Sequence, residues 1–235
     1  MEMLLKLPLR LMAIAGFIEK GASVADIGTD HGYLPVYLAQ NGLARSIIAC
    51  DISAGSLETA RRSADKYNVS DKITFVVAPG LSGIDEANTD TIVISGLGGE
   101  TIAAILEASP RTKRGGVTLI LQPQSKLNEL CLFLRENGYI IQEAKLVCDN
   151  NRFYVIIKAG GGKSNCILAP DIELLTQLMF RRDPLFSGYL DRLIAKTRKA
   201  LEGMGKSGSP DIIGMTVRLA TYSGLKESYE NANCK

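Results

Sequence analysis

The sequence contains no tryptophan, one histidine and only five cysteines in 235 residues. The cysteines form no Cys-x-x-Cys pair and are odd in number, which predicts buried thiols of a cytosolic protein rather than a disulfide framework or a zinc site. No apolar run approaches the roughly 18 residues of a membrane helix, and the N-terminus lacks the pattern of a signal peptide. We therefore expect a cytoplasmic protein with no metal site and no membrane contact.

An excess of charge of one sign is also missing, because 27 Lys and Arg residues nearly balance 25 Asp and Glu residues. The balance changes along the chain: residues 1–162 carry a net charge of −1 and residues 163–235 a net charge of +3. This mild basic excess permits a nucleic-acid partner without requiring one. The apolar fraction of 46% is sufficient for a sizeable core and argues against disorder.

What is present is an alternation of two patterns. Short apolar runs bounded by glycine or polar residues predict strands, and apolar residues at three- and four-residue spacing predict helices. The expected strands are residues 23–27, 46–51, 73–77, 91–95, 117–122, 139–147 and 152–159. The expected helices are residues 9–19, 33–40, 53–67, 126–136 and one that ends near residue 108. Five strand–helix units followed by a hairpin indicate an α/β fold with a seven-stranded, mostly parallel sheet and a terminal antiparallel hairpin.

A different pattern begins after this alternation. Residues 160–164, Gly-Gly-Gly-Lys-Ser, are typical of a linker. Beyond them the periodicity predicts only helices, at residues 172–180, 184–204 and 212–229. We therefore expect two domains: a sheet domain at residues 1–162 and a small helical, coiled-coil-like domain at residues 163–235.

The stretch Asp-Ile-Gly-Thr-Asp-His-Gly-Tyr-Leu-Pro at residues 26–35 follows the first expected strand, where parallel sheets bind ligands. The second strand ends in Asp51, whose carboxylate can accept hydrogen bonds from both hydroxyls of a ribose. A dinucleotide would require the pattern G-x-G-x-x-G, but Asp30 occupies the place of the pyrophosphate. Asp26 and Asp30 instead suit a sulfonium and an α-amino group. The alternative is that both acids only cap the following helix.

Three further features each have two interpretations. His31 is either a reactive group or a hydrogen-bonded structural residue. Ser95-Gly96-Leu97-Gly98-Gly99 either opens the backbone for a flat substrate group or makes a simple turn before a helix. Gln122-Pro123-Gln124 either reads the edge of a base or closes a loop.

Together these residues resemble the bacterial tRNA (adenine-N1)-methyltransferases that modify adenine 22. The matching motifs are residues 26–35, the acid Asp51, Ser-Gly-Leu-Gly-Gly at 95–99 and Leu-Ile-Leu-Gln-Pro at 119–123. The resemblance extends through the hairpin and, more loosely, into the helical tail. It implies a Rossmann-like class I methyltransferase fold, S-adenosylmethionine as the cofactor and a C-terminal helical domain that helps to hold tRNA.

The resemblance also implies roles for individual residues. Three residues would face the reaction centre: Asp30, His31 and Tyr33. Nine residues would bind the cofactor: Asp26, Gly28, Asp51, Ile52, Ala78, Pro79, Gly80, Ser95 and Gly96. Phosphate contacts are expected from basic residues of the tail, for which a solvated helix face is the alternative: Arg181, Arg182, Arg192, Lys196, Arg198 and Lys199.

The chain departs from the family at Ala78-Pro79-Gly80, where Gly-Asp-Gly is usual. Proline supplies neither the carboxylate that would reach the adenine amino group nor a backbone donor. Two alternatives to tRNA methylation therefore stay open: a methyltransferase that acts on a small molecule, and a non-catalytic tRNA-binding protein with a degenerate cofactor site. A nicotinamide oxidoreductase is a more distant alternative because the glycine fingerprint is missing. We expect a monomer or a weak dimer.

Overall fold

The computed structural model describes residues 4–84, 88–207 and 211–233. These residues form two compact units, residues 1–173 and residues 174–235. The unit boundary falls inside a helix, α6 (Pro170–Phe180). The functional division between residues 162 and 163 stays a prediction.

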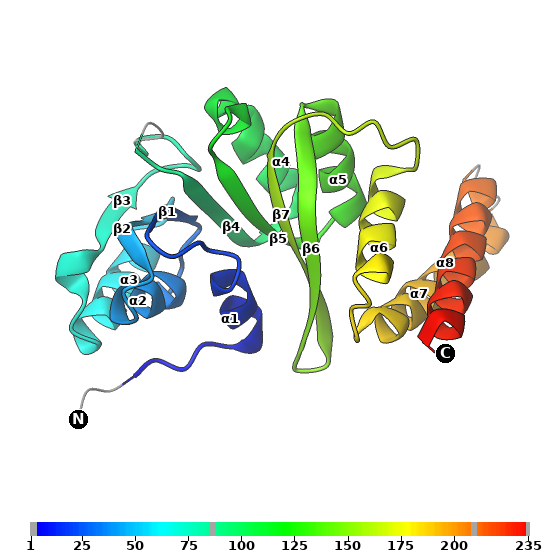
Figure 1. Ribbon diagram of the computed structural model, residues 1–235, viewed down its shortest axis with the longest axis horizontal. Helices are drawn as coiled ribbons and strands as arrows, with labels where there is room; N and C mark the ends of the chain where they lie inside the picture. The colour runs from blue at the N-terminus through cyan, green and yellow to red at the C-terminus, as the bar shows by residue number, and fades with distance from the viewer. Residues whose placement is uncertain (1–3, 85–87, 208–210, 234–235) are drawn as a thin grey trace. The chain divides into compact units, whose positions relative to one another are not determined.

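The first unit is built on one seven-stranded sheet, and Figure 1 shows its strands from β3 at one edge to β6 at the other. The strands are β1 (Ala22–Ile27), β2 (Ala44–Asp51), β3 (Thr74–Val77), β4 (Thr91–Gly98), β5 (Thr118–Ser125), β6 (Tyr139–Asp149) and β7 (Arg152–Gly161). Their order is β3-β2-β1-β4-β5-β7-β6, and all neighbours are parallel except β7, which runs antiparallel to both β5 and β6. The predicted parallel sheet with a terminal antiparallel hairpin is confirmed.

Helices cover both faces of this sheet (Figure 1). They are α1 (Leu9–Ala15), α2 (Tyr33–Gln40), α3 (Ala54–Lys66), α4 (Gly99–Glu107) and α5 (Leu127–Glu136), with short 3-10 turns η1 (Ser70–Lys72) and η2 (Pro110–Lys113). Ser53 caps α3, because its side chain accepts a hydrogen bond from the backbone N–H of Ser56 at 3.2 Å.

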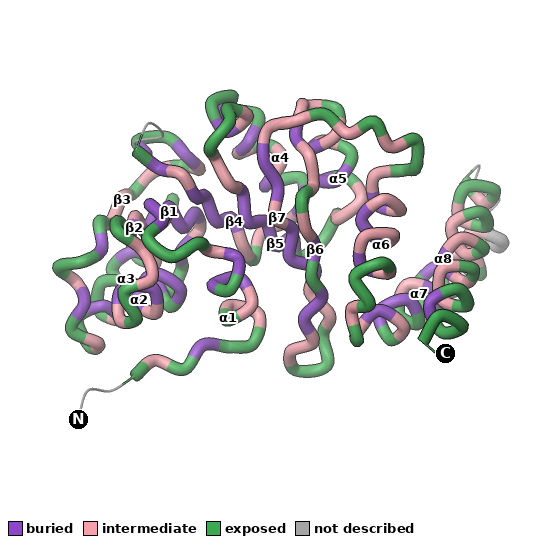
Figure 2. The backbone as a smooth tube through the Cα atoms, in the orientation of Figure 1, coloured by how far each residue is buried: buried purple, intermediate pink, exposed green. Residues whose placement is uncertain are grey.

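The centre of the sheet is the core of the unit. Every residue of β1 is buried, since β2 and β4 flank it and helices cover both of its faces. Val24, Val93 and Ile120 are fully buried on three different strands. Figure 2 shows this buried band continuing through the middle strands. A rigid, dry core of this kind fixes where the strand ends lie, and the strand ends carry the polar residues discussed below.

The sheet differs from the sequence prediction where its strands end. β4 and β5 continue to Gly98 and Ser125, past the expected stops at Ser95 and Gln122. Pro123 does not end β5, because the pairing with β4 shifts register on both sides of Leu97 and so accommodates a residue without an N–H. The described residues between β3 and β4 contain no helix, so the strand–helix alternation is broken once there.

The glycines at the end of β7 also differ from the prediction of a flexible linker. Gly160 and Gly161 belong to the strand. A Cβ at Gly161 would lie 1.9 Å from the carbonyl oxygen of Lys113, and one at Gly162 would lie 2.8 Å from Cγ2 of Ile140. Glycine is therefore required here for close packing inside the first unit rather than for flexibility.

The second unit pairs two long helices, α7 (Phe186–Ser207) and α8 (Ile212–Asn233). Phe186 and Tyr229 pack edge to face with ring centroids 5.2 Å apart, and the Tyr229 hydroxyl donates to the carbonyl of Asp183 at 2.7 Å. Lys226 of α8 pairs with Asp191 of α7 at 2.5 Å. A search of the described residues finds no helix with the length and apolar character of a membrane span.

Four of the five cysteines lie in the described residues, and all four are free thiols. Cys50 and Cys131 are buried as predicted, whereas Cys148 and Cys166 are only half-buried. Cys234 lies outside the described residues.

Candidate active site

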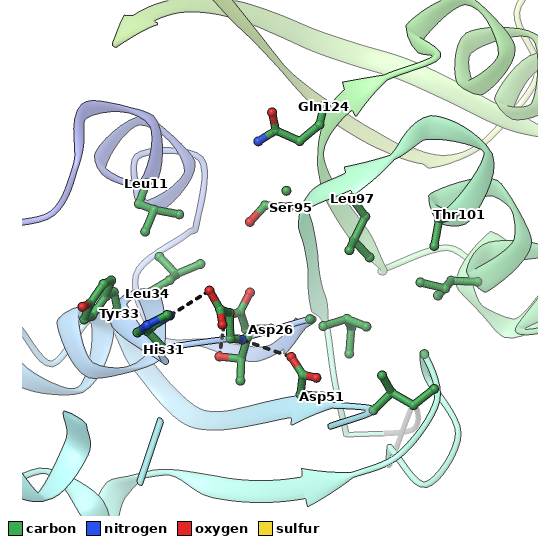
Figure 3. Close-up of a pocket in the computed structure, with 18 of the residues that line it drawn as sticks. Leu11, Asp26, His31, Tyr33, Leu34, Asp51, Ser95, Leu97, Thr101 and Gln124 are labelled. Carbon is green, nitrogen blue, oxygen red and sulfur yellow. Dashed lines mark hydrogen bonds and ion pairs between the residues drawn. The ribbon is translucent and has the colours of Figure 1, made fainter. Parts of the chain in front are cut away.

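A cavity of about 750 Å³ opens at the carboxyl ends of β1, β2 and β4 in the first unit (Figure 3). The chain leaves β1 toward β2 on one side, while β4 flanks β1 on the other, so the cavity lies where the strand order reverses. Open α/β sheets bind their ligands at this switch point. Its walls come from the start of α1, the β1–α2 turn, the ends of β2, β3 and β5, and the β4–α4 region.

The β1–α2 turn is held in shape by left-handed backbone and by β2. Gly28 and Gly32 have φ angles of 74° and 68°, and Asp30 has a φ of 51°. The N–H groups of Gly28 and Thr29 both donate to the carbonyl of Cys50, at 2.8 and 3.0 Å. A Cβ at Gly32 would lie 2.8 Å from the Cβ of Ala60, so the turn packs directly on α3. The two glycines of the motif are thus explained by backbone conformation and close approach.

Asp26 is the buried acid of the cavity, with only 4% of its surface exposed. Its Oδ2 accepts a hydrogen bond from the Thr29 hydroxyl at 2.8 Å. Burial raises the pKa of Asp26 to about 6, although the Thr29 hydroxyl and the charge of Arg10 both favour the ionised form. A cation placed beside this buried carboxyl group would therefore stabilise its ionised form.

Asp51, at the end of β2, receives two backbone hydrogen bonds. Oδ2 accepts from the N–H of Asp30 at 3.1 Å, and Oδ1 accepts from the N–H of Ser53 at 2.9 Å. A carboxylate has about four lone-pair sites, so the group keeps capacity for two more donors. This oriented and only partly occupied carboxylate fits the pair of hydroxyls on a ribose.

Asp30, His31 and Tyr33 form a more exposed group at the mouth of the cavity. The Asp30 carboxylate lies 2.8 Å from Nδ1 of His31, with side chains 72% and 51% exposed. The His31 and Tyr33 rings stack with centroids 5.5 Å apart and planes inclined by 30°. Figure 3 shows His31 pointing into the cavity and Tyr33 beside it, opposite Leu11. The alternative that Asp26 only caps the following helix fails, because Asp26 is buried within β1 and α2 begins at Tyr33.

The end of β3 forms the opposite wall. The N–H of Ala78 donates to the carbonyl of Asp51 at 3.0 Å, and the Cys50 thiol lies within hydrogen-bond range of the carbonyls of Ala78 and Gly80. Burial and the charge of Asp51 raise the pKa of the Cys50 thiol, so it serves as a donor. Apolar groups complete this wall, namely Ile52, Pro79, Leu97 and Ile105.

The β4–α4 segment contributes Ser95, Gly96, Leu97 and Thr101. Gly96 has a φ of 82°, which keeps its backbone open toward the cavity. Gly99 has a different purpose: a Cβ there would lie 2.2 Å from the carbonyl oxygen of Lys126, so it allows α4 to pack against the start of α5. The close packing at Gly99 supports the interpretation of a turn before a helix, and the opening for a flat substrate group at Gly96 stays a prediction.

Every residue that the sequence assigned to catalysis or cofactor binding lines this one cavity. Gln124 lines it too, whereas Gln122 is fully buried and does not. The sequence missed the contribution of the N-terminal segment, which adds Pro8, Arg10 and Leu11. Arg10 was detectable only as a basic residue on an expected amphipathic helix, which is a weak signal. No cluster of three or more candidate metal ligands occurs in the part of the chain that the structure describes.

A family model described as a methyltransferase domain matches residues 7–157, which include every residue of this cavity. The chain belongs to this methyltransferase family. A tRNA (adenine(22)-N(1))-methyltransferase of Bacillus subtilis is 35% identical over 158 residues, an alignment that covers 67% of this chain and 66% of that protein. The sequence alignment thus spans just under two thirds of that curated relative.

Solved structures of similar proteins extend over nearly the whole chain. The Bacillus subtilis m1A22 tRNA methyltransferase superposes with a TM-score of 0.83 and 27% identity, covering 94% of this chain and 99% of that one. A Streptococcus pneumoniae protein solved in complex with S-adenosyl-L-methionine superposes with a TM-score of 0.81 and 27% identity, covering 95% and 100%. The predicted fold, the resemblance to tRNA (adenine-N1)-methyltransferases and S-adenosylmethionine as the cofactor of this methyltransferase family are confirmed.

Proposed function

We propose that this methyltransferase transfers a methyl group from S-adenosylmethionine to N1 of adenine 22 in tRNA. The observation that carries the proposal is the single cavity in which an oriented carboxylate, a buried carboxylate and an exposed acid–imidazole pair converge. The similarity to tRNA (adenine(22)-N(1))-methyltransferases supplies the substrate and the modified atom.

The residues present fit the cofactor. Asp51 would hold the ribose hydroxyls, and Asp26 would face the α-ammonium group, whose positive charge favours the ionised carboxylate. Gly28 and Gly96, which both have positive φ, line the cavity without a side chain. Bound S-adenosylmethionine supplies an electrophilic methyl group on a sulfonium.

The adenine end of the cofactor would lie against the β3 wall. There Ile52, Pro79 and Ile105 offer apolar surface, and Gly80 packs closely under Ile105, since a Cβ at Gly80 would lie 3.2 Å from its Cγ2. No carboxylate at residues 78–80 reaches the adenine amino group, because those residues are Ala, Pro and Gly. We therefore assign adenine binding in this chain to packing rather than to a charged hydrogen bond.

The reaction does not need a general base to activate the nucleophile. Adenine N1 carries a free lone pair at neutral pH, so catalysis rests mainly on holding that nitrogen in line with the methyl group. The exposed Asp30 carboxylate, 2.8 Å from Nδ1 of His31, can stabilise the positive charge that develops on the ring or accept a proton from the N6 amino group. The stacked His31 and Tyr33 rings offer a flat surface for an unpaired base.

The helical unit is proposed as the tRNA-holding part. Arg192, Lys196 and Lys199 are exposed on α7 at three- and four-residue spacing, so they share one face of the helix. A row of cations of this kind suits consecutive phosphates. A tRNA substrate also supports the expectation of a cytoplasmic location, and the expectation of a monomer or weak dimer stays a prediction.

The proposal is tested by incubating the full chain with labelled S-adenosylmethionine and unmodified tRNA, followed by mapping of the modified nucleotide. Label at N1 of adenine 22 is the expected result. Label on a small molecule alone supports the small-molecule methyltransferase. Binding of tRNA without binding of S-adenosylhomocysteine in calorimetry supports the non-catalytic alternative.

A further inference from the structure

A second cavity lies at the opposite end of the sheet from the candidate active site. Its volume is about 360 Å³, near the lower limit of the roughly 300–1,000 Å³ that ligand pockets occupy. Its described lining residues lie at or just before the amino ends of β2, β4 and β5, whereas the active-site cavity lies at carboxyl ends of the same sheet. An eight-residue strand such as β2 spans about 25 Å, so a ligand in this second cavity would be separate from the cofactor.

Three arginines line this second cavity, which we call the arginine cavity. Arg45 belongs to β2, Arg111 to η2, and Arg114 to the turn between η2 and β5. All three residues are exposed. Asp90, just before β4, is the one acid among the described residues that line the cavity. Three guanidinium groups and one carboxylate leave these residues with a net charge of +2.

The Asp90 carboxylate is already held by other groups of the protein. Its Oδ1 accepts hydrogen bonds from the backbone N–H of Ser23 and from the Thr91 hydroxyl, both at 3.0 Å, and its Oδ2 lies 2.9 Å from Nη2 of Arg45. Arg45 also donates from Nη1 to the carbonyl of Gly21 at 3.2 Å. These contacts fix one guanidinium at the cavity wall, and they leave the carboxylate little capacity to neutralise the other two arginines.

Arg111 and Arg114 have no such partner. Neither side chain makes an ion pair or a hydrogen bond with any residue that the structure describes. Each therefore keeps the N–H donors of its guanidinium available. Like charges around one small cavity repel one another, and an anion between them would replace that repulsion by attraction. Because these arginines line one concave site, they differ from cations scattered over a solvated surface.

The turn after η2 adds backbone donors to the same wall. Gly115 and Gly116 both line the cavity, and in the described part of the chain neither N–H donates to a backbone carbonyl. A Cβ at either glycine would meet no atom within 4 Å, so the space beside this backbone is open. Backbone N–H groups presented by turns bind anions. The turn therefore adds neutral donors to the charged donors of the arginines.

We propose that the arginine cavity binds phosphate. A terminal phosphate offers three oxygens, and a nucleic-acid backbone offers two on each successive phosphate, so either can accept from several guanidinium forks at once. A single carboxylate offers only two oxygens to three arginines. The phosphate comes either from the backbone of bound tRNA or from a free phosphate-bearing molecule. This site goes beyond the proposed function, because it is a second ligand site at the far end of the sheet from methyl transfer.

The test uses two probes with the full chain, inorganic phosphate and unmodified tRNA. Calorimetry measures the affinity for inorganic phosphate, and tRNA affinity is measured over a range of salt concentrations. The variant Arg111→Gln/Arg114→Gln removes both unpartnered arginines, and Arg111→Lys/Arg114→Lys keeps their charge without the planar fork. Arg62→Gln/Lys66→Gln is the matched control, because it removes two exposed cations of α3 that lie outside the cavity. Thermal unfolding of each variant reports whether it folds.

In the double glutamine variant, the affinity for inorganic phosphate is expected to fall about tenfold, whereas the control stays within about twofold of the wild type. The double lysine variant should lose less. If the tRNA backbone supplies the phosphate, the slope of log affinity against log salt also becomes smaller by about two units. A loss for inorganic phosphate with an unchanged slope assigns the site to a free phosphate-bearing molecule. Changes no larger than those of the control in both measurements overturn the proposal.

The outcome for the arginine cavity is separable from the outcome for methyl transfer. If the wild-type chain does not methylate tRNA, a loss of phosphate binding in the double glutamine variant still supports the cavity while the proposed substrate fails. If the wild-type chain methylates tRNA and the double glutamine variant behaves as the control does, the arginine cavity fails and the proposed function stands.

Discussion

The backbone N–H of Asp30 donates to Oδ2 of Asp51 at 3.1 Å, which joins the β1–α2 turn to the end of β2. The two residues lie 21 positions apart in the sequence. The contact uses the backbone of Asp30, so the carboxylate of that residue stays available at the mouth of the cavity, where it pairs with His31. Backbone and side chain of one residue therefore belong to two different parts of the proposed site.

This division makes Asp30→Asn an informative variant. Asparagine tolerates the φ of 51° at this position and keeps the N–H that Asp51 accepts. We expect the methylation rate to fall about 100-fold, since the negative charge near the reacting base is lost, while S-adenosylhomocysteine affinity stays within about twofold. Single-turnover kinetics and calorimetry measure the two quantities. Asp71→Asn, an exposed acid of η1, is the control, and a wild-type rate in Asp30→Asn would show that the role of Asp30 is wrong.

Cofactor affinity should depend on pH through Asp26. The pKa of this carboxyl is raised to about 6 by burial, and the ionised form is the one that attracts an ammonium group. Lowering the pH from 8 to 5 crosses that pKa and protonates most of the free protein at Asp26, so S-adenosylhomocysteine affinity should fall about tenfold. Binding near pH 6 should release protons, which calorimetry in buffers of different ionisation enthalpy detects. The Asp26→Asn variant should bind weakly with a flat profile; a wild-type profile in it would contradict this account.

The same burial predicts a stability effect with the opposite direction. The pKa of Asp26 in the folded protein lies above the value near 4 of an unfolded chain, so the folded protein binds the proton more tightly. The free energy of unfolding therefore falls as the pH rises from about 4 to about 6. Asp26→Asn removes this cost while its amide oxygen can still accept from Thr29. We expect the variant to be more stable than the wild type by about 1–3 kcal/mol at pH 8 in urea unfolding. The advantage should shrink toward pH 4, and an equal difference at both pH values would assign it to another cause.

The tail is tested through its charges rather than by removing it. The double variant Lys196→Gln/Lys199→Gln removes two exposed cations from one face of α7. We expect weaker tRNA binding and a smaller slope of log affinity against log salt, by roughly one unit for each lost phosphate contact. S-adenosylhomocysteine affinity should not change. Lys72→Gln on η1 is the control, and an unchanged salt slope in the tail variant would favour a solvated helix face.

The sequence predicted the cavity better than it predicted the contacts within it. Strand ends such as Asp26 and Asp51 are visible locally, because each apolar run stops at its polar residue. Arg10 was not assigned to the site, because its partner Gln122 lies 112 positions away and only the assembled sheet brings them together. The extension of β5 past Pro123 was missed for a similar reason, since it depends on a register shift in the neighbouring strand.

Residues 78–80 are Ala-Pro-Gly where Gly-Asp-Gly is usual in the tRNA (adenine-N1)-methyltransferases that the chain resembles. A last test therefore replaces Pro79 by aspartate. Pro79 lines the cavity on the apolar β3 wall, and its ring supplies no hydrogen bond there. If packing alone holds the adenine, Pro79→Asp should add a charged hydrogen bond to the adenine amino group and tighten S-adenosylhomocysteine binding about tenfold. Pro79→Ala controls for loss of the ring, and S-inosylhomocysteine, which lacks the amino group, should show no gain with either variant. If Pro79→Asp binds S-adenosylhomocysteine no more tightly than Pro79→Ala, the backbone of this loop holds residue 79 away from the adenine. The adenine end of the site would then have to be placed elsewhere in the cavity.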